Sequence, residues 1–198
     1  TETMRINSSS DALDHIATID CGASNDLDQR GYPRPAGAAC DIGALELENF
    51  SLDINGPASY TIPQGATTPQ TVTMTWSIAL PVPVTGLTFD VTVSSGVTAT
   101  IYDADGLLVP GCLFDGVDTT TCVLGDLPAG DINGEIDFVF AATRTADIVW
   151  SGTIAYGFED ANPADDSDAG VIDIIVSPSC VAISATDTTC DGIDDNCN

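Results

Sequence analysis

Between residues 70 and 176, apolar and polar residues alternate in short runs, and this pattern limits the possible folds more than any other feature of the chain. From Thr71 to Ile78 every second residue is apolar, and the residues between them are threonines and a serine. Successive side chains of a β-strand point to opposite faces, so such a run predicts a strand with one buried face. The same period recurs at 87–93, 97–101, 136–140, 148–156 and 172–176.

Turn-forming residues separate these runs. They include Pro81 to Pro83, Ser94-Ser95-Gly96, Asp105-Gly106, Asn133-Gly134 and Asn162-Pro163. Seven or so short strands at this spacing are typical of an immunoglobulin-like sandwich of two antiparallel sheets. Trp76 and Trp150 are in phase with the apolar residues of their strands, so we predict that both lie in the core rather than on a sugar-binding surface.

The charge of the chain is strongly negative: 30 acidic residues stand against four arginines and no lysine, a formal net charge of −26. Binding to nucleic acid is excluded because the phosphates need clustered basic side chains. Direct contact with an anionic membrane is excluded for the same reason. Self-repulsion of this size opposes compaction, which indicates an environment rich in Ca²⁺ or salt.

Seven cysteines and a single histidine, with no C-x-x-C pair, argue against a zinc site. The cysteines suggest three local disulfides, namely Cys21 with Cys40, Cys112 with Cys122, and Cys190 with Cys197, and they leave Cys180 over. Each bridge would contribute on the order of 2–3 kcal/mol, and three of them indicate an oxidising compartment. The sequence has no nucleophile elbow and no phosphate-binding glycine loop, so we predict that the chain is not an enzyme.

The first module, residues 1–48, contains the motifs Asp28-Gln29-Arg30-Gly31 and Cys40-Asp41-Ile42-Gly43-Ala44-Leu45-Glu46. They resemble the stretch that ends the right-handed parallel β-helix of large bacterial surface and secreted proteins. The resemblance implies terminal rungs, which are stable only when a neighbour covers them. Asp28, Arg30 and Asp41 have two possible roles, as acid/base groups of a polysaccharide lyase or as an ion-pair network inside the terminal turn. We favour the second, because a lyase site extends over several rungs.

The second module, residues 49–178, resembles a repeated immunoglobulin-like domain of bacterial surface proteins whose function is uncharacterised. The resemblance rests on Gly111-Cys112, Thr121 to Gly125, Leu127 to Gly130, and the loop from Asp160 to Ser167. In that family the loop carries paired asparagines where this chain has Asp165 and Asp166. The resemblance implies a spacer or stalk domain without an active site.

Two acidic segments are candidate Ca²⁺ sites. The first holds Asp160, Asp165, Asp166 and Asp168. Unit charges ~4 Å apart repel by about 1 kcal/mol even in water, so a cation would relieve the loop, although the sequence alone favours a simply solvated loop.

The second candidate site lies in the third module, residues 179–198. The run from Cys190 to Asn198 resembles the Asp-rich metal-binding repeat of secreted bacterial proteins. The resemblance points to Asp191, Asp194, Asn196 and Asn198, the last three of which occupy alternate positions of a calcium loop. An acidic tail without a bound ion is the alternative.

Together these features predict an all-β chain: terminal rungs of a parallel β-helix, an immunoglobulin-like antiparallel sandwich, and the start of a calcium-loop repeat. We expect a non-enzymatic extracellular stalk or fibre subunit of a bacterial surface protein, stiffened by disulfides and Ca²⁺. It would contact neighbouring domains of a longer chain or assemble head-to-tail with itself into a filament. The alternatives are an adhesin or glycan-binding module, or the tail of a secreted β-helix polysaccharide lyase.

Overall fold

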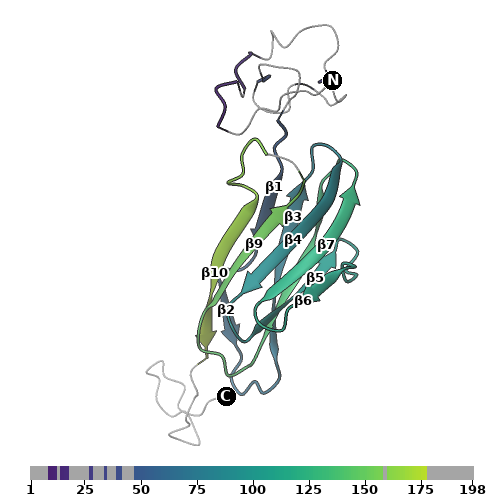
Figure 1. The fold of residues 1–198 in the computed structure, drawn as a ribbon. Coiled ribbons are helices and arrows are strands. Elements are labelled where there is room, and N and C mark those ends of the chain that lie inside the picture. The colour runs from purple at the N-terminus through teal and green to yellow at the C-terminus, as the bar shows by residue number, and fades with distance from the viewer. Residues whose placement is uncertain are drawn as a thin grey trace, which may run out of the picture.

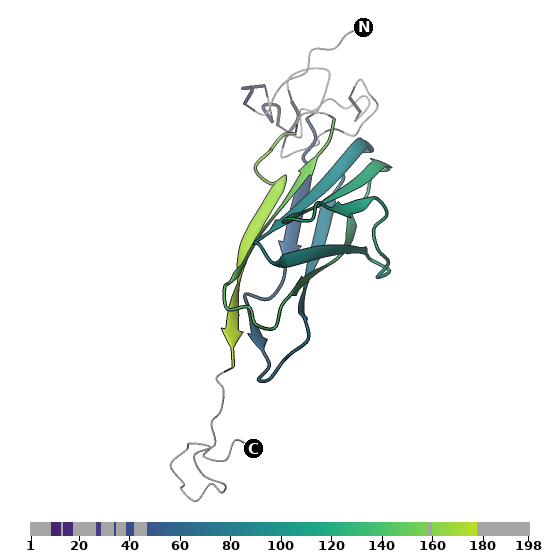
Figure 2. The same ribbon diagram turned by 60° about the horizontal axis from the view of Figure 1, so that its bottom comes forward.

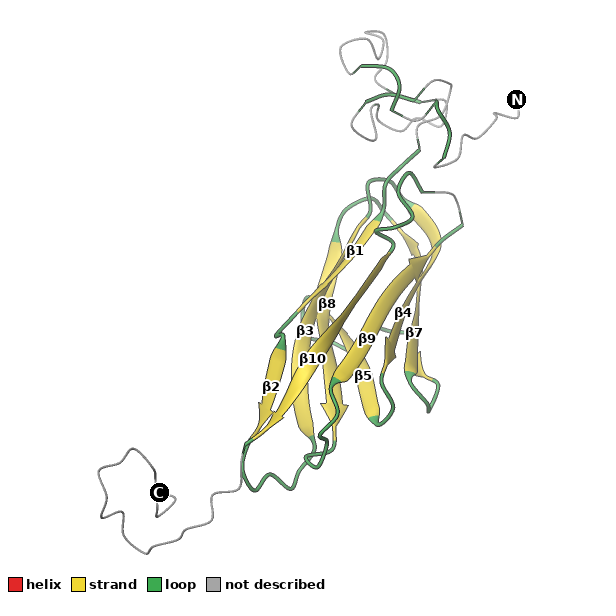
Figure 3. Ribbon diagram, turned by 90° about the vertical axis from the view of Figure 1, so that its left-hand side faces the viewer, coloured by secondary structure: helices red, strands yellow, loops and turns green. Residues whose placement is uncertain are grey.

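The structure is a computed structural model that describes residues 9–12, 14–17, 27–28, 34, 39–41, 47–157 and 160–177. The described part is all-β and contains no helix, hence no helix that could cross a membrane (Figure 3). Its strands are β1 (Ser51–Asn55), β2 (Ser59–Ile62), β3 (Gln70–Ala79), β4 (Val84–Val93), β5 (Val97–Asp103), β6 (Cys112–Phe114), β7 (Thr119–Leu127), β8 (Ile132–Phe140), β9 (Ile148–Ala155) and β10 (Ser167–Val176).

These strands form two packed sheets (Figure 1). The four-stranded sheet has the order β1-β3-β8-β5 and the six-stranded sheet has the order β2-β10-β9-β4-β7-β6. All neighbours are antiparallel except β2 and β10, which are parallel. The spatial order is that of an immunoglobulin-like sandwich. The order along the chain differs in one respect. Here β5, at the edge of the four-stranded sheet, comes before β6 and β7 of the six-stranded sheet, whereas in the immunoglobulin arrangement the corresponding edge strand comes after them.

The alternating runs form the core as predicted. In β3 the residues Val72, Met74, Trp76 and Ile78 are buried, and the indole of Trp76 packs against Phe89 of β4 with ring centroids 5.3 Å apart. One residue was assigned wrongly: the pattern placed Val176 inside with Ile172 and Ile174, but it is 48% exposed. Val176 is the last residue of β10, where it pairs with Ile62 at the end of β2, so the sandwich ends before it can be covered.

Three strands carry almost no sequence signal. β2 and β6 have four and three residues, too few to show a period. β7 turns Thr120 inward, where its hydroxyl donates a 2.8 Å hydrogen bond to the carbonyl of Ala99 in β5 and so joins the two sheets. A buried threonine that satisfies its hydroxyl in this way breaks the apolar pattern without a large cost.

The first strand is divided between the sheets: β1 pairs with β3, and β2 pairs with β10. Gly56 lies at the crossing, where a Cβ atom would overlap the side chain of Met74. Gly152 of β9 faces β1 across the core, and a Cβ there would overlap the side chain of Ile54. The two glycines therefore allow the first strand to approach the rest of the sandwich closely.

A parallel β-helix is not shown by the described residues of the first module. These residues form an antiparallel bridge between Ile16 and Cys40, held by two backbone hydrogen bonds of 2.8 and 2.9 Å. Arg30 and the rest of the Gly31 loop up to Pro33 lie outside the described residues, as does the whole third module, residues 179–198.

The chain enters the sandwich at residues 47–50 and leaves it after Val176, at the opposite end (Figures 1 and 2). The loop between β9 and β10 lies at the entry end. Its backbone contacts the entering segment, because the amide of Ala161 donates a 2.9 Å hydrogen bond to the carbonyl of Glu48.

Candidate functional site

Three aspartates of the β9–β10 loop meet at the entry end of the sandwich. Carboxylate oxygens of Asp160, Asp165 and Asp166 all lie within 4.8 Å of one another. The structure thus brings together three of the four loop residues expected from the sequence.

Asp160 is the buried centre of this group, with 3% of its surface exposed. Its Oδ2 atom accepts hydrogen bonds from the backbone amide of Phe50 at 3.0 Å and from the hydroxyl of Tyr156 at 2.6 Å. Its Oδ1 atom accepts from the amide of Asn162 at 3.0 Å. A buried carboxylate with three such donors is held in place, so Asp160 is not part of a merely solvated loop.

Asp165 is satisfied on one oxygen only. Its Oδ2 atom accepts from the side-chain amides of Asn49 at 3.1 Å and Asn162 at 3.0 Å. Its Oδ1 atom is buried and has no hydrogen-bond partner among the described residues, and the same is true of the Oδ1 atom of Asn49. Buried oxygens without a donor are costly, so a further group is expected to meet them.

The Tyr156 hydroxyl lies between two carboxylates. Its oxygen is 2.6 Å from Asp160 Oδ2 and 2.7 Å from Asp166 Oδ1. A phenol carries a single proton and can donate only once. One of the two short contacts therefore needs a second proton, on Asp166, or a cation that takes its place.

The pKa values of Tyr156 and Asp166 are both raised, which reflects this shortage of positive charge. Burial, followed by the hydrogen bonds to Asp160 and Asp166, raises the pKa of Tyr156 far above its usual range, so the hydroxyl keeps its proton. The pKa of Asp166 is raised to about 6, mainly by burial and also by the neighbouring Asp160 and Asp165, although the hydrogen bond from Tyr156 lowers it.

No arginine among the described residues is paired with the three carboxylates. Arg144 lies elsewhere, where its guanidinium donates to the carbonyls of Ser95 and Asp147 and to the hydroxyl of Ser94. Carboxylate and amide oxygens are hard ligands that suit Ca²⁺ or Mg²⁺ rather than softer metals. The cluster thus has the chemistry of a hard-cation site.

Asp168 is not a member of the cluster. Its Oδ2 atom accepts a 2.8 Å hydrogen bond from the backbone amide of Ile54 in β1, and its Oδ1 atom accepts one from the amide of Ala169. The other expected cation ligands, Asp191, Asp194, Asn196 and Asn198, lie outside the described residues.

Sequence reasoning missed two contributors to the cluster, Asn49 and Tyr156. Tyr156 continues the apolar phase of β9, and only its polar tip could have indicated a buried hydrogen-bond partner. Asn49 lies more than a hundred residues before Asp165, and no local pattern in the sequence connects the two.

The disulfide and ion-pair expectations are met in part. Cys112 and Cys122 form the expected disulfide between opposite residues of β6 and β7. Cys40 is also disulfide-bonded, but Cys21, Cys190 and Cys197 lie outside the described residues.

Asp41 has a structural role. It is 1% exposed, and its carboxylate accepts from the backbone amides of Asp14 and Leu47, both at 2.7 Å. Arg34 donates to the backbone carbonyl of Asp41 at 2.8 Å, and Asp28 is buried as well. The contacts of Asp41 favour a structural network over an acid/base group, although Arg30 was the expected partner.

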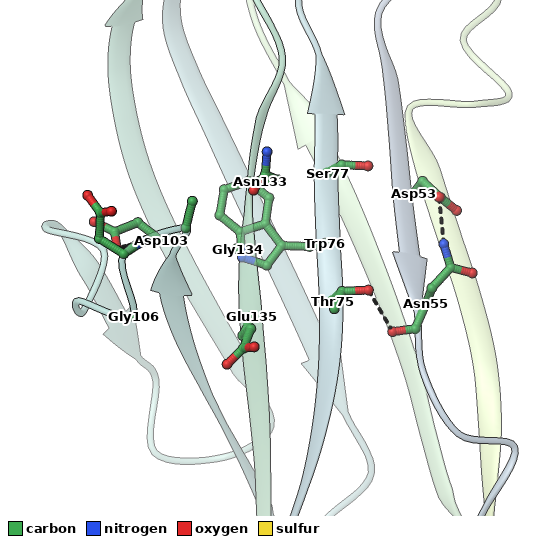
Figure 4. A pocket seen from close by; sticks show the side chains of 12 residues that line it. Asp53, Asn55, Thr75, Trp76, Ser77, Asp103, Gly106, Asn133, Gly134 and Glu135 are labelled. Carbon is green, nitrogen blue, oxygen red and sulfur yellow. Dashed lines mark hydrogen bonds between the residues drawn. The ribbon is translucent and has the colours of Figure 1, made fainter.

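Apart from the acidic cluster, a concave surface with a volume of about 660 Å³ lies on the four-stranded sheet (Figure 4). Its wall includes Asp53 and Asn55 of β1, Glu135 of β8 and the turn after Asp103, with Trp76 at its floor. Trp76 is only 4% exposed, and its indole N–H donates to the carbonyl of Tyr102 at 3.0 Å. Trp150 is also buried, so neither indole presents a face for stacking on a sugar.

Comparison with known proteins finds no family model and no curated protein that matches this chain. Solved structures with a similar arrangement include the CARDB domain of a Pyrococcus furiosus protein, with 10% identity over 66% of this chain and 98% of that one and a TM-score of 0.42. The bacterial hydrophobin BslA has 14% identity, covers 68% of this chain and 100% of its own, and gives a TM-score of 0.41. AggA, the major subunit of aggregative adherence fimbriae type I from Escherichia coli, has 10% identity, covers 66% and 97%, and gives a TM-score of 0.37.

At these identities and TM-scores the likeness carries no information about function. The function has to be argued from the chain's own residues.

Proposed function

We propose that this chain is a non-enzymatic structural module of an extracellular or cell-surface protein, a spacer through which the polypeptide passes from one end to the other. The observation that carries the proposal is the position of the two connections: the chain enters at residues 47–50 and leaves after Val176 at opposite ends of the sandwich (Figure 1). A module of this kind adds length between its neighbours. The Cys112–Cys122 disulfide supports an oxidising, extracellular location.

We also propose that the cluster of Asp160, Asp165 and Asp166 binds one divalent cation, with Ca²⁺ the best fit. Support comes from the buried oxygens of Asp165 and Asn49 to which no group in the described part of the chain donates a hydrogen bond. Support also comes from the pKa of Asp166, which is raised to about 6 by burial and by the neighbouring carboxylates. A cation would satisfy the oxygens and replace the missing proton. Ca²⁺ tolerates an irregular set of oxygen ligands better than Mg²⁺ does.

The cation would act on the entry joint. Asn49 and Phe50 belong to the segment that enters the sandwich, and both donate hydrogen bonds to cluster carboxylates. By reducing the repulsion among those carboxylates, the cation would hold this segment against the β9–β10 loop. The β-helix end before it, the calcium-loop repeat after it, and head-to-tail assembly into a filament remain predictions of the sequence.

A Ca²⁺ titration followed by thermal unfolding tests the cation site. At a Ca²⁺ concentration 100 times the dissociation constant, linkage gives ~2.7 kcal/mol of added stability. For a domain of this size that corresponds to a rise in Tm of roughly 5–10 °C over the EDTA sample. Asp166→Asn should abolish the rise. The matched control is Asp137→Asn, which removes a carboxylate that accepts from Thr73 on the outer face of the four-stranded sheet, and it should keep the rise.

Limited chymotrypsin digestion tests the joint itself. Phe50 is fully buried, so cleavage after it requires the entry segment to detach. We expect cleavage at Phe50 in EDTA and protection in Ca²⁺, identified by the masses of the fragments. Equal Tm values and equal cleavage in EDTA and in Ca²⁺ would refute the cation site.

A further inference from the structure

We infer that the acidic loop and the last strand form a mechanical latch on the first strand, so that tension along the spacer passes directly from β1 and β2 to β10. The inference rests on the proposed spacer function, because it concerns load between the entry and the exit. It does not depend on a bound cation.

The entry half of the latch consists of three hydrogen bonds at alternate residues. The amide of Phe50 donates to Asp160 Oδ2 at 3.0 Å, the amide of Leu52 to the carbonyl of Asp165 at 2.8 Å, and the amide of Ile54 to Asp168 Oδ2 at 2.8 Å. All three acceptors lie in the β9–β10 loop or at the start of β10. Hydrogen-bonded strands turn successive amides to opposite sides, so the amides of Leu52 and Ile54 are those of β1 that point away from β3, and Phe50 lies one residue before the strand.

These amides would otherwise form an open sheet edge. β1 is the outer strand of the four-stranded sheet, and the free amides of an edge strand invite pairing with another chain. An aspartate side chain and a backbone carbonyl of the β9–β10 loop, together with the side chain of Asp168 at the start of β10, occupy them instead. The acidic residues thus close the edge and tie the two sheets together at the same place.

The exit half of the latch is the parallel pairing of β2 with β10. Asp173 to Val176 lie opposite Ser59 to Ile62. The ladder is extended by the amide of Asp173, which donates to the carbonyl of Ala58 at 3.0 Å, and by the amide of Ser177, which donates to the carbonyl of Ile62 at 3.3 Å. The first and last strands are therefore joined over most of the length of the sandwich, mainly by side chains at the entry end and by backbone at the exit end.

The direction of the strands decides how these bonds are loaded. β2 and β10 run parallel, and Figure 3 shows both pointing towards the exit end. Tension pulls β1 and β2 back towards the entry and β10 forward towards the exit, so the two strands slide against each other. Bonds that cross the line of sliding share the load and must break together, whereas a hairpin that is peeled open breaks them one at a time.

Single-molecule force spectroscopy on the full chain, held at its two ends in EDTA, tests the latch. Asp168→Ala removes the acceptor of the Ile54 amide. The loss of this hydrogen bond to a charged carboxylate should speed unfolding at constant force by about tenfold. A tenfold change in rate is equivalent to ~1.4 kcal/mol.

The matched control is Asp115→Ala. The carboxylate of Asp115 accepts from the backbone amides of Val117, Asp118 and Thr119 in the β6–β7 turn, away from the terminal strands. This variant should unfold under force at the wild-type rate. If Asp168→Ala does not fold, Asp168→Asn replaces it, and since its amide keeps one acceptor oxygen we expect a smaller increase, about threefold.

The possible results separate the latch from the spacer. Equal rates for the Asp168 and Asp115 variants would overturn the latch while the spacer function stands. A second pull, between the β2–β3 loop at 63–69 and the C-terminal end, loads β2 and β10 at the same end of the sandwich and should unfold the wild type at lower force. Equal forces along both axes would also overturn the latch, because the bonds between β2 and β10 would then not share the load of sliding.

Discussion

Replacing Tyr156 by phenylalanine tests whether its hydroxyl holds the acidic cluster together. The ring would remain against Phe50, whose centroid lies 4.5 Å away, so packing should change little. The variant loses the hydroxyl that contacts Asp160 at 2.6 Å and Asp166 at 2.7 Å. Because the hydroxyl carries one proton and donates only once, the loss corresponds to one hydrogen bond to a charged group, about 1.5–3 kcal/mol.

Urea unfolding at pH 7 in EDTA measures this loss, and the chain offers a matched control. Tyr60 is also half-buried against an aromatic ring, that of Phe140, and its hydroxyl donates to the neutral side chain of Gln70 at 3.1 Å. Tyr60→Phe should cost only about 0.5–1.5 kcal/mol. If Tyr156→Phe costs no more than Tyr60→Phe, the hydroxyl does not hold the cluster together and the reasoning fails.

Three further predictions concern acidity, the disulfide and the core. The pKa of Asp166 is raised from 3.8 to about 6, so between these values only the folded chain keeps the proton, and the stability contributed by this group falls as pH rises through that window. Urea midpoints in EDTA from pH 4 to 7 should show this decline in the wild type relative to Asp166→Asn, and a flat difference would contradict it. Replacing both Cys112 and Cys122 by serine should lower the free energy of unfolding by roughly 2–3 kcal/mol, and an unchanged urea midpoint would show that the β6–β7 edge does not need the bridge. Gly152→Ala adds a methyl group that overlaps Ile54 and should lower the free energy of unfolding by about 1–3 kcal/mol in the same assay. Gly116→Ala is the comparison, because no atom lies within 4 Å of its new carbon. It measures the effect of replacing a positive-φ glycine without overlap.

The sequence predicts most strands of the sandwich because their signal is local. In β3, and in β4 from Leu87 onward, every second side chain is apolar because both sheets cover these residues, whereas an irregularity between Val84 and Leu87 breaks the period at the start of β4. The period also fails at Val176, where coverage ends, and in β7, where a buried threonine finds a hydrogen-bond partner in the opposite sheet. Short strands such as β6 have no period to detect.

The candidate site divides in the same way. The acidic loop and the Cys112–Cys122 pair were visible in the sequence because their members lie within ten residues of each other. The sequence could not separate Asp168 from the cluster. Its carboxylate accepts a hydrogen bond from the amide of Ile54, and that contact depends on the position of β1 in the folded chain.

By itself, then, the sequence determined an all-β chain, the faces of its long strands, one disulfide and an acidic loop, since each depends on residues close together along the chain. Only the tertiary structure decided that Asn49 and Phe50 complete the cluster, and that β1 and β10 are joined. Those contacts link residues up to 116 positions apart, and a hydrogen bond across such a distance depends on how the two sheets pack rather than on any local preference.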